Sequence, residues 1–215
     1  MEHEPYGLYE KYVKRPLDCL LSSIAIIALS PLIFMIAVLV RKKLGSPVLF
    51  VQERPGRNEK IFKLYKFRTM TDAKDDNGNL LPDTARLTPF GKALRMTSLD
   101  ELPELLNIIK GDMAIIGPRP LLTEYLPYYT EAERHRHDVR PGLSGLAQVN
   151  GRNFLPWDQR LAYDIQYVEK IKFLSDMKIF FQTALKVIKR TDVAADTAAA
   201  DEGYLNKIRI KRREN

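Results

Sequence analysis

An uncharged apolar segment near the N-terminus constrains the fold of this chain more than any other feature. No charged residue lies between Cys19 and Val40, and Ser30-Pro31 stands in the middle of that segment. About 20 helical residues cross the hydrocarbon core of a bilayer, so the segment is long enough to span a membrane. Proline has no N–H for the carbonyl four residues back. We therefore expect a kink or break at Pro31, with the Ser30 hydroxyl able to bond the freed carbonyl of Ile27.

Basic residues flank the apolar segment on both sides. Lys14 and Arg15 precede it, and Arg41-Lys42-Lys43 follow it. Lys and Arg prefer the cytoplasmic side of a membrane, which leaves two interpretations open. One is a V-shaped re-entrant helix, broken at Ser30 and Pro31, that enters and leaves by the same face. The other is a single span kinked by proline. A cleaved signal peptide is not expected, because no small-residue cleavage site follows the apolar run.

The charge of the chain is concentrated beside the apolar segment. The 215 residues carry a formal net charge of +7, and residues 41–70 alone hold nine basic residues against two acidic ones. Such a cluster attracts anionic headgroups, holds a polyanionic substrate, or simply fixes topology. No groove-reading motif accompanies it, so nucleic acid is not an expected partner. The single cysteine, Cys19, excludes an internal disulfide and a Cys-rich metal site.

The pattern predicts an α+β fold, mainly helical with a small β component. A hairpin is expected over 47–54 and 60–70, joined by turn residues at 55–58. Thr88-Pro89 is typical of a helix start, and Lys110-Gly111 of a helix end. Further helices are expected from Asp100, within 123–138, around 161–168 and over about 174–190. The last one suits either the headgroup plane or the core.

The pattern divides the chain into three regions. They are a lead-in with the membrane helix (1–46), a folded domain beside the membrane (47–192) and a mobile tail (193–215). Within the second region, 141–152 is glycine-rich and is expected to form an ordered loop, preceded by a short strand at 113–116.

Asp100-Glu101 is the first candidate for chemistry. Acidic residues at a helix start cap free N–H groups, and Ser98-x-x-Glu101 has the spacing of a capping box. The functional alternative is a carboxylate available as a nucleophile or as a ligand of Mg²⁺. A second carboxylate beside it can share the metal, which lets an anion approach a phosphate.

Three arginines fit a phosphate site around these acids. They are Arg95, Arg119 between two prolines, and Arg152 at the end of the glycine-rich loop. Guanidinium groups bind phosphate oxygens bidentately, although each one alone is more often part of a surface salt bridge. His135 and His137 are expected to be surface or packing residues, because positions i and i+2 do not face one helical site.

Four motifs in order resemble the bacterial sugar transferase family, most closely the small monotopic phosphoglycosyl transferases of the PglC type. The resemblance covers about Tyr12 to Asp192. It rests on the segments Lys66-Phe67-Arg68-Thr69-Met70, Ser98-Leu99-Asp100-Glu101-Leu102-Pro103-Glu104-Leu105, Gly117-Pro118-Arg119-Pro120 and Pro141-Gly142-Leu143-Ser144-Gly145-Leu146-Ala147-Gln148-Val149-Asn150-Gly151-Arg152.

The resemblance implies transfer of a sugar-1-phosphate from a UDP-sugar to undecaprenyl phosphate, with release of UMP. Asp100 is then the nucleophile that forms an aspartyl phosphosugar, and Glu101 supports a Mg²⁺-dependent step. Arg95, Arg119 and Arg152 are implied to hold nucleotide and phosphate groups. Ser30-Pro31 is implied to break a re-entrant helix, which places the site at the cytoplasmic face of the bacterial inner membrane.

Several alternatives stay open at the level of sequence. The donor is expected to be an N-acetylated sugar such as diacetylbacillosamine, as in protein glycosylation; UDP-galactose or UDP-glucose, as in polysaccharide biosynthesis, is the alternative. A non-catalytic basic module bound to membrane lipids is the rival from another class. The sequence also allows a homo-oligomer.

Overall fold

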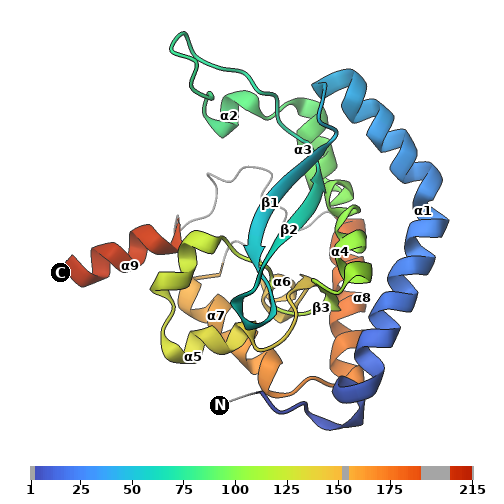
Figure 1. Ribbon diagram of the computed structural model, residues 1–215, viewed down its shortest axis with the longest axis vertical. Helices are drawn as coiled ribbons and strands as arrows, with labels where there is room; N and C mark the ends of the chain where they lie inside the picture. Colours follow the sequence, from blue (N-terminus) through green and yellow to red (C-terminus); the bar gives the residue numbers. More distant parts are fainter. Residues whose placement is uncertain (1–2, 152–154, 190–203, 215) are drawn as a thin grey trace.

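The computed structural model describes residues 3–151, 155–189 and 204–214 (Figure 1). These residues form a mainly helical body with two small sheets, which confirms the predicted α+β class. The helices are α1 (Lys14–Leu44), α2 (Asp83–Arg86), α3 (Pro89–Met96), α4 (Glu104–Lys110), α5 (Glu131–Arg134), α6 (Leu146–Val149), α7 (Trp157–Glu169), α8 (Phe173–Lys189) and α9 (Leu205–Glu214). Shorter helical turns are η1 (Tyr9–Val13), η2 (Arg57–Glu59), η3 (Leu99–Glu101), η4 (Thr123–Tyr128) and η5 (His135–His137).

The predicted hairpin is present. Strand β1 (Leu49–Pro55) pairs antiparallel with β2 (Ile61–Phe67), with Leu49 opposite Phe67 and Pro55 opposite Ile61. Helix α4 packs against β2, and η4 lies against β1. The hairpin therefore lies between α4, which precedes the Gly117-Pro118-Arg119-Pro120 motif, and η4, which follows it.

The second sheet confirms the short strand expected at 113–116, but its pairing partner was not predicted. Strand β3 (Ala114–Ile116) pairs in parallel with β4 (Gly142–Ser144), which lies within the segment expected to be a loop. The two strands approach closely: a Cβ on Gly142 would lie 2.1 Å from the backbone nitrogen of Gly117. Position 142 therefore requires glycine. The close approach brings the Gly117-Pro118-Arg119-Pro120 motif beside the glycine-rich segment 141–152.

Helix α1 is continuous through Ser30-Pro31, so the expected break is corrected to a bend. The Ser30 hydroxyl donates to the Ile27 carbonyl at 2.8 Å, and this is the carbonyl that Pro31 leaves without its helical donor. Figure 1 shows α1 curving around one side of the molecule, with both ends leaning toward the body. The hydrogen bond from Ser30 keeps the helix intact where proline would otherwise interrupt it.

Both ends of α1 pack on the same globular body. Near the start, Lys14 lies 2.6 Å from Asp176 of α8, and Arg15 donates to carbonyls at the end of α4. Near the end, apolar side chains of α1 pack with β2 and α3, forming the cluster Ile36, Val40, Leu44, Phe67 and Leu94. Tyr9–Leu44 is long and apolar enough to cross a membrane, yet its two ends are held by neighbouring elements of one body.

Two helices, α1 and α8, expose many apolar side chains. On α1 these are Leu20, Leu21, Ile24, Ile27, Phe34, Met35 and Val38; on α8 they are Phe173, Leu174, Phe180, Phe181, Leu185 and Ile188. Helix α8 packs on α6, β3 and β4, and its first turn meets the start of α1 through Asp176 and Lys14. Of the two predictions for α8, the exposed apolar face favours the headgroup plane over the core.

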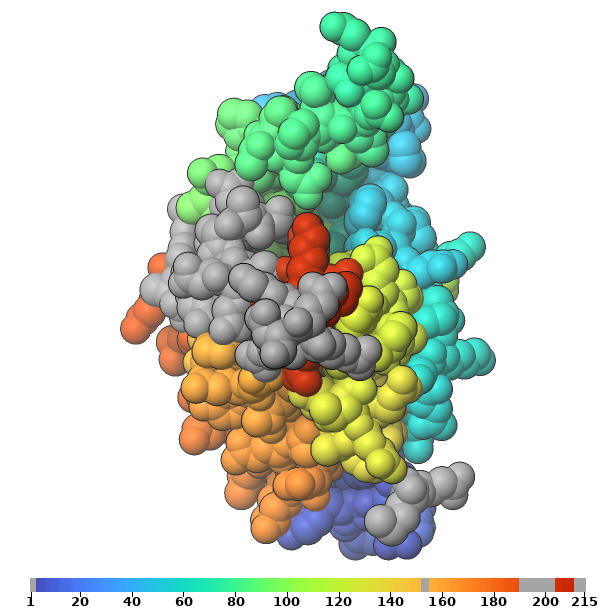
Figure 2. Space-filling model, turned by 90° about the vertical axis from the view of Figure 1, so that its left-hand side faces the viewer, coloured from blue at the N-terminus to red at the C-terminus, as the bar shows by residue number. Residues whose placement is uncertain are grey.

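The C-terminal segment differs from the predicted mobile tail where the structure describes it. Helix α9 packs on η4, and its Leu205 is fully buried with Tyr125, Tyr129, Trp157 and Leu161. Figure 2 shows α9, in red, against the yellow segment that contains η4 and α5. The partners of Leu205 come from distant parts of the chain, which explains why a basic tail sequence gave no sign of docking.

Candidate active site

Asp100 and Glu101 lie in η3, a single helical turn between α3 and α4. Thr88 caps α3 as predicted, accepting a hydrogen bond from the Gly91 backbone at 3.0 Å. After α3 the chain reverses at Ser98, which has a φ of 55° in the left-handed region. The Ser98 side chain makes no capping hydrogen bond, so the predicted capping box is absent. Helix α4 begins only at Glu104.

Glu101 is held by two cations from other elements. Lys66, on β2, places its Nζ 2.7 Å from Glu101 Oε1, and Arg119 places its Nη2 2.8 Å from the same oxygen. Lys66 also lies 3.1 Å from Oε1 of the buried Glu104. Three of the four resembling motifs therefore meet at one carboxylate.

The carboxylates of this cluster differ in electrostatic environment. Burial opposes ionisation of Glu101, but Lys66 and Arg119 overcome it and hold its pKa well below the usual range. Burial raises the pKa of Asp100, and the neighbouring charge of Glu101 adds to that shift. Burial, together with Glu101, raises the pKa of Glu104 to about 7. The site thus pairs a firmly ionised carboxylate with one whose charge is poorly compensated.

Asp100 is buried, with 8% of its surface exposed. Lys66, Arg95 and Arg119 all lie near enough to favour its ionised form. Arg95 itself is fixed by a 3.1 Å hydrogen bond from its Nε to the hydroxyl of Thr69. A Cβ on Gly91 would lie 1.8 Å from the Thr69 carbonyl, so only glycine lets α3 approach this segment and carry Arg95 there.

Arg119 is anchored through its backbone by a buried ion pair. Arg136 donates to the Arg119 carbonyl at 2.7 Å and lies 2.8 Å from Asp164 of α7, and both charged side chains are 2% exposed. The guanidinium of Arg119, by contrast, belongs to a side chain that is 43% exposed. A fixed backbone with an accessible head suits a residue that receives an anionic substrate.

The structure brings together Asp100, Glu101, Arg95 and Arg119 of the predicted site. Arg152 lies outside the described residues, and Ser30 and Pro31 lie at the bend of α1, apart from the cluster. His135 is exposed beside Asp138, and His137 is buried against Tyr129, as expected for surface and packing residues. Lys66 and Glu104 were missed as site residues, although both stand inside motifs that the sequence singled out.

The donor set fits Mg²⁺ only in company with a phosphate. Within the described ranges no group of three His, Cys, Asp or Glu residues could hold a metal by itself. In phosphate-transfer sites Mg²⁺ commonly takes one or two carboxylates and completes its shell with phosphate oxygens and water. Asp100 and Glu101 are adjacent, and the cations on Glu101 contact only Oε1. Such a pair can supply one or two ligands.

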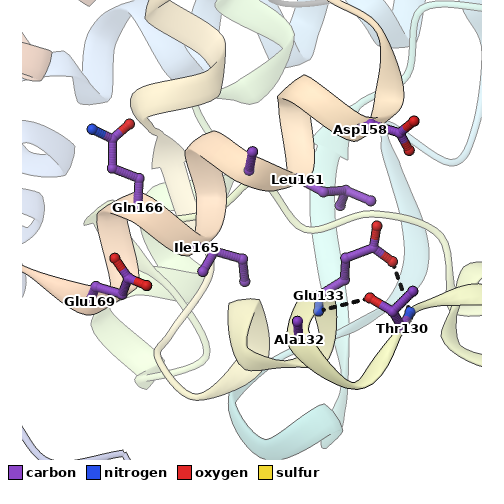
Figure 3. A pocket seen from close by; sticks show the side chains of 9 residues that line it. Thr130, Ala132, Glu133, Asp158, Leu161, Ile165, Gln166 and Glu169 are labelled. Carbon is purple, nitrogen blue, oxygen red and sulfur yellow. Dashed lines mark hydrogen bonds between the residues drawn. The ribbon is translucent and has the colours of Figure 1, made fainter.

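A separate hollow of about 420 Å³ lies between α5 and α7 (Figure 3). Its floor is apolar, with Leu161 and Ile165, and its rim carries Glu133, Asp158 and Glu169. Glu133 closes a capping box with Thr130, and Arg209 of α9 contacts both Glu133 and Asp158. None of its lining residues belongs to the carboxylate cluster, so it is distinct from the candidate active site.

Comparison with known proteins places the chain in a family. The model of the family described as "Bacterial sugar transferase" matches residues 9–190. The chain is 54% identical over 157 residues to an uncharacterized sugar transferase, EpsL, of Bacillus subtilis, a match that covers 73% of this chain and 77% of the relative. It is 39% identical over 187 residues to the exopolysaccharide production protein ExoY of Sinorhizobium fredii, covering 79% and 83%.

A third relative is longer. The undecaprenyl-phosphate galactose phosphotransferase of Salmonella typhimurium is 34% identical over 197 residues, which cover 84% of this chain but 41% of that protein. The order of the four motifs, the meeting of three of them at Glu101 and the match over residues 9–190 agree. This chain belongs to the bacterial sugar transferase family.

Proposed function

We propose that the protein transfers a sugar-1-phosphate from a UDP-sugar to undecaprenyl phosphate and releases UMP. The observation that carries this proposal is the arrangement around Asp100. A buried carboxylate stands beside a second one neutralised by Lys66 and Arg119, within reach of three cations. The Salmonella relative is named for the same class of reaction, the transfer of a galactose phosphate to undecaprenyl phosphate.

In the first step, a carboxylate oxygen of Asp100 forms a bond to the phosphorus that carries the sugar. The bond from that phosphorus to the UMP oxygen breaks, and UMP leaves with the electron pair. In the second step, a phosphate oxygen of undecaprenyl phosphate attacks the same phosphorus and displaces Asp100. Poor compensation of charge on Asp100 supports its role as a nucleophile, while Glu101 stays ionised to hold Lys66 and Arg119.

Arg95, Arg119 and Arg152 are proposed to bind the phosphate groups of donor and acceptor. Asp100 and Glu101 would hold Mg²⁺ together with the substrate phosphate. When bound there, the ion supplies charge neutralisation between the phosphates and the attacking carboxylate. The protein's own part is to position Arg119 through Arg136 and to orient Glu101 through Lys66.

A re-entrant α1 would place this site at the cytoplasmic face of the inner membrane. A straight helix of 31 residues is about 46 Å long, so the two ends of a spanning α1 would lie on opposite sides of a bilayer. Both ends instead contact the same body, and basic residues flank both. The bend at Pro31 and the exposed apolar faces of α1 and α8 further support this placement.

The sugar of the UDP-sugar donor is the part of the substrate specificity that experiment has to determine. The sequence favours an N-acetylated sugar such as diacetylbacillosamine, whereas the Salmonella relative is named for galactose and ExoY for exopolysaccharide production. Incubation with undecaprenyl phosphate and a panel of UDP-sugars, with UMP release as readout, separates N-acetylated donors from UDP-galactose and UDP-glucose.

Asp100→Asn tests the mechanism itself. We expect it to abolish both UMP release and covalent labelling by a UDP-sugar carrying a radioactive sugar phosphate, because an amide cannot replace the attacking carboxylate. Asp83→Asn, at a half-exposed carboxylate in α2, is the matched control and should retain activity. Turnover by Asp100→Asn would overturn the assignment of the nucleophile. Salt-sensitive binding of anionic lipid without any turnover by the wild type would favour the non-catalytic module.

A further inference from the structure

Arg54 is a basic residue that the proposed mechanism leaves without a role. It stands near the end of β1, opposite Phe62 of β2. Its Nη2 donates to the side chain of Gln52 at 2.7 Å. Its Nε is buried and has no hydrogen-bond partner among the described residues. An unsatisfied buried donor on a charged group costs stability, so a ligand that completes its hydrogen bonding is a natural reason to keep it.

The charge of Arg54 is also poorly compensated. No carboxylate in the described part of the chain lies within ion-pair distance of it. Burial and the nearby Arg119 together lower the pKa of Arg54 to about 10, with Glu104 opposing the shift. Arg119 has Glu101 as a partner, whereas Arg54 has no counterpart. Two guanidinium groups near enough for one to lower the pKa of the other, with only Arg119 neutralised by a carboxylate, favour an anion with more than one charge.

We infer that Arg54 acts with Arg119 to bind the diphosphate of the nucleotide donor, an inference that rests on the proposed function. A diphosphate carries several negative charges over adjacent phosphates, and each guanidinium can bind one of them bidentately. Arg54 is thus a substrate-binding residue specific to the first half-reaction.

The position of Arg54 indicates the soluble donor rather than the lipid acceptor. Strand β1 lies on the side of the hairpin away from α1, and β2 lies nearer to α4 and α1 (Figure 1). Besides Arg119 and Glu104, the ionisable groups near Arg54 are the phenols of Tyr125 and Tyr129, in and after η4. The lipid phosphate is expected on the side of the apolar helices, whereas strand β1, which carries Arg54, lies on the other side of the hairpin.

The test is binding of UDP and UMP to the detergent-solubilised full chain, measured by calorimetry. Arg54→Gln should weaken UDP binding about 10-fold or more and UMP binding less than threefold, since a charge-assisted contact to a single phosphate is lost. Arg57→Gln is the matched control: Arg57 is exposed on the same hairpin, donates to the Asp138 carbonyl, and should bind UDP like the wild type.

Thermal unfolding separates a binding role from a structural one. If Arg54 is kept for the ligand, the ligand-free Arg54→Gln protein should unfold at the same temperature as the wild type or higher, because an unneutralised buried charge is removed. A lower unfolding temperature with equal losses for UDP and UMP would overturn the inference. Unchanged UDP affinity, or a raised KM for undecaprenyl phosphate alone, would also overturn it.

These outcomes are distinct from failure of the proposed function. A wild type that binds UDP through Arg54 but never releases UMP from any donor would refute the proposed reaction and leave the diphosphate site standing.

Discussion

At the scale of single residues, Lys66 joins two parts of the candidate site, because one ammonium group contacts both the partly buried Glu101 and the buried Glu104. It contacts Glu101 at 2.7 Å and Glu104 at 3.1 Å. Lys66→Gln should reduce kcat/KM for UMP release by about 100-fold, the usual cost of removing one preorganised charged contact. Lys63→Gln, at an exposed position on the same strand, should change it little. Comparable activity in the two variants would show that Lys66 is dispensable.

His137 makes stability depend on pH. Burial and the neighbouring Arg136 lower its pKa from 6.5 to about 3 in the folded protein. Between pH 6.5 and about 3, the His137 side chain therefore binds a proton in the unfolded chain but not in the folded protein. The free energy of unfolding falls as pH drops below about 6.5, by roughly 1.4 kcal/mol per pH unit. His137→Gln should flatten this dependence in denaturant unfolding between pH 7 and 5. His135→Gln, at an exposed histidine, should leave the slope unchanged, and an equal slope in all three proteins would contradict the assignment.

At the scale of elements, local signals predicted structure well where the partners are local. Thr88-Pro89 predicts the start of α3, and the Thr88 hydroxyl does bond Gly91. Ser98-x-x-Glu101 has equally good spacing, but Glu101 is drawn to Lys66 and Arg119, which lie 35 and 18 residues away along the chain. Tertiary charge pairing outweighed a local cap.

The residues of the candidate site also divide into those that the sequence predicted and those that only the fold brings together. Asp100, Glu101, Arg95 and Arg119 were predicted together from residue type and motif order, because phosphate chemistry selects carboxylates and guanidinium groups, and the structure does bring these four residues together. Arg54 lies outside the four motifs, and only the folded hairpin brings it near Arg119. The parallel β3–β4 pairing likewise depends on a contact between Gly117 and Gly142 that no periodicity reveals.

Helix α9 offers a test of docking. Leu205 is fully buried against η4 and α7, while Ile210, on the same helix, is 40% exposed. Leu205→Ala should remove about 2–5 kcal/mol of packing, enough to release a short helix from the body. Trypsin should then cleave after Lys207 and Arg209 faster than in the wild type, whereas Ile210→Ala should leave the cleavage rate unchanged. Equal rates in all three proteins would show that Leu205 does not hold α9.

At the scale of the whole molecule, the path of α1 determines how the protein sits in a membrane. In a Cys19→Ser background, Tyr12→Cys and Lys42→Cys place a thiol at an exposed position near each end of α1. A re-entrant helix predicts that both thiols react with an impermeant maleimide only after the inner membrane is opened. A periplasmic marker protein controls for intactness. Labelling of either thiol in intact spheroplasts would instead indicate a span.

The anchoring of Arg119 has a consequence for the order of events in the whole reaction. Its carbonyl is tied to Arg136 and thereby to α7, while its guanidinium remains accessible. Torsions of one flexible side chain can then follow a phosphorus atom from nucleotide to lipid while the main chain stays still. The two proposed half-reactions would then use the same main-chain position of Arg119, and only its side chain would turn from the departing nucleotide to the incoming lipid phosphate.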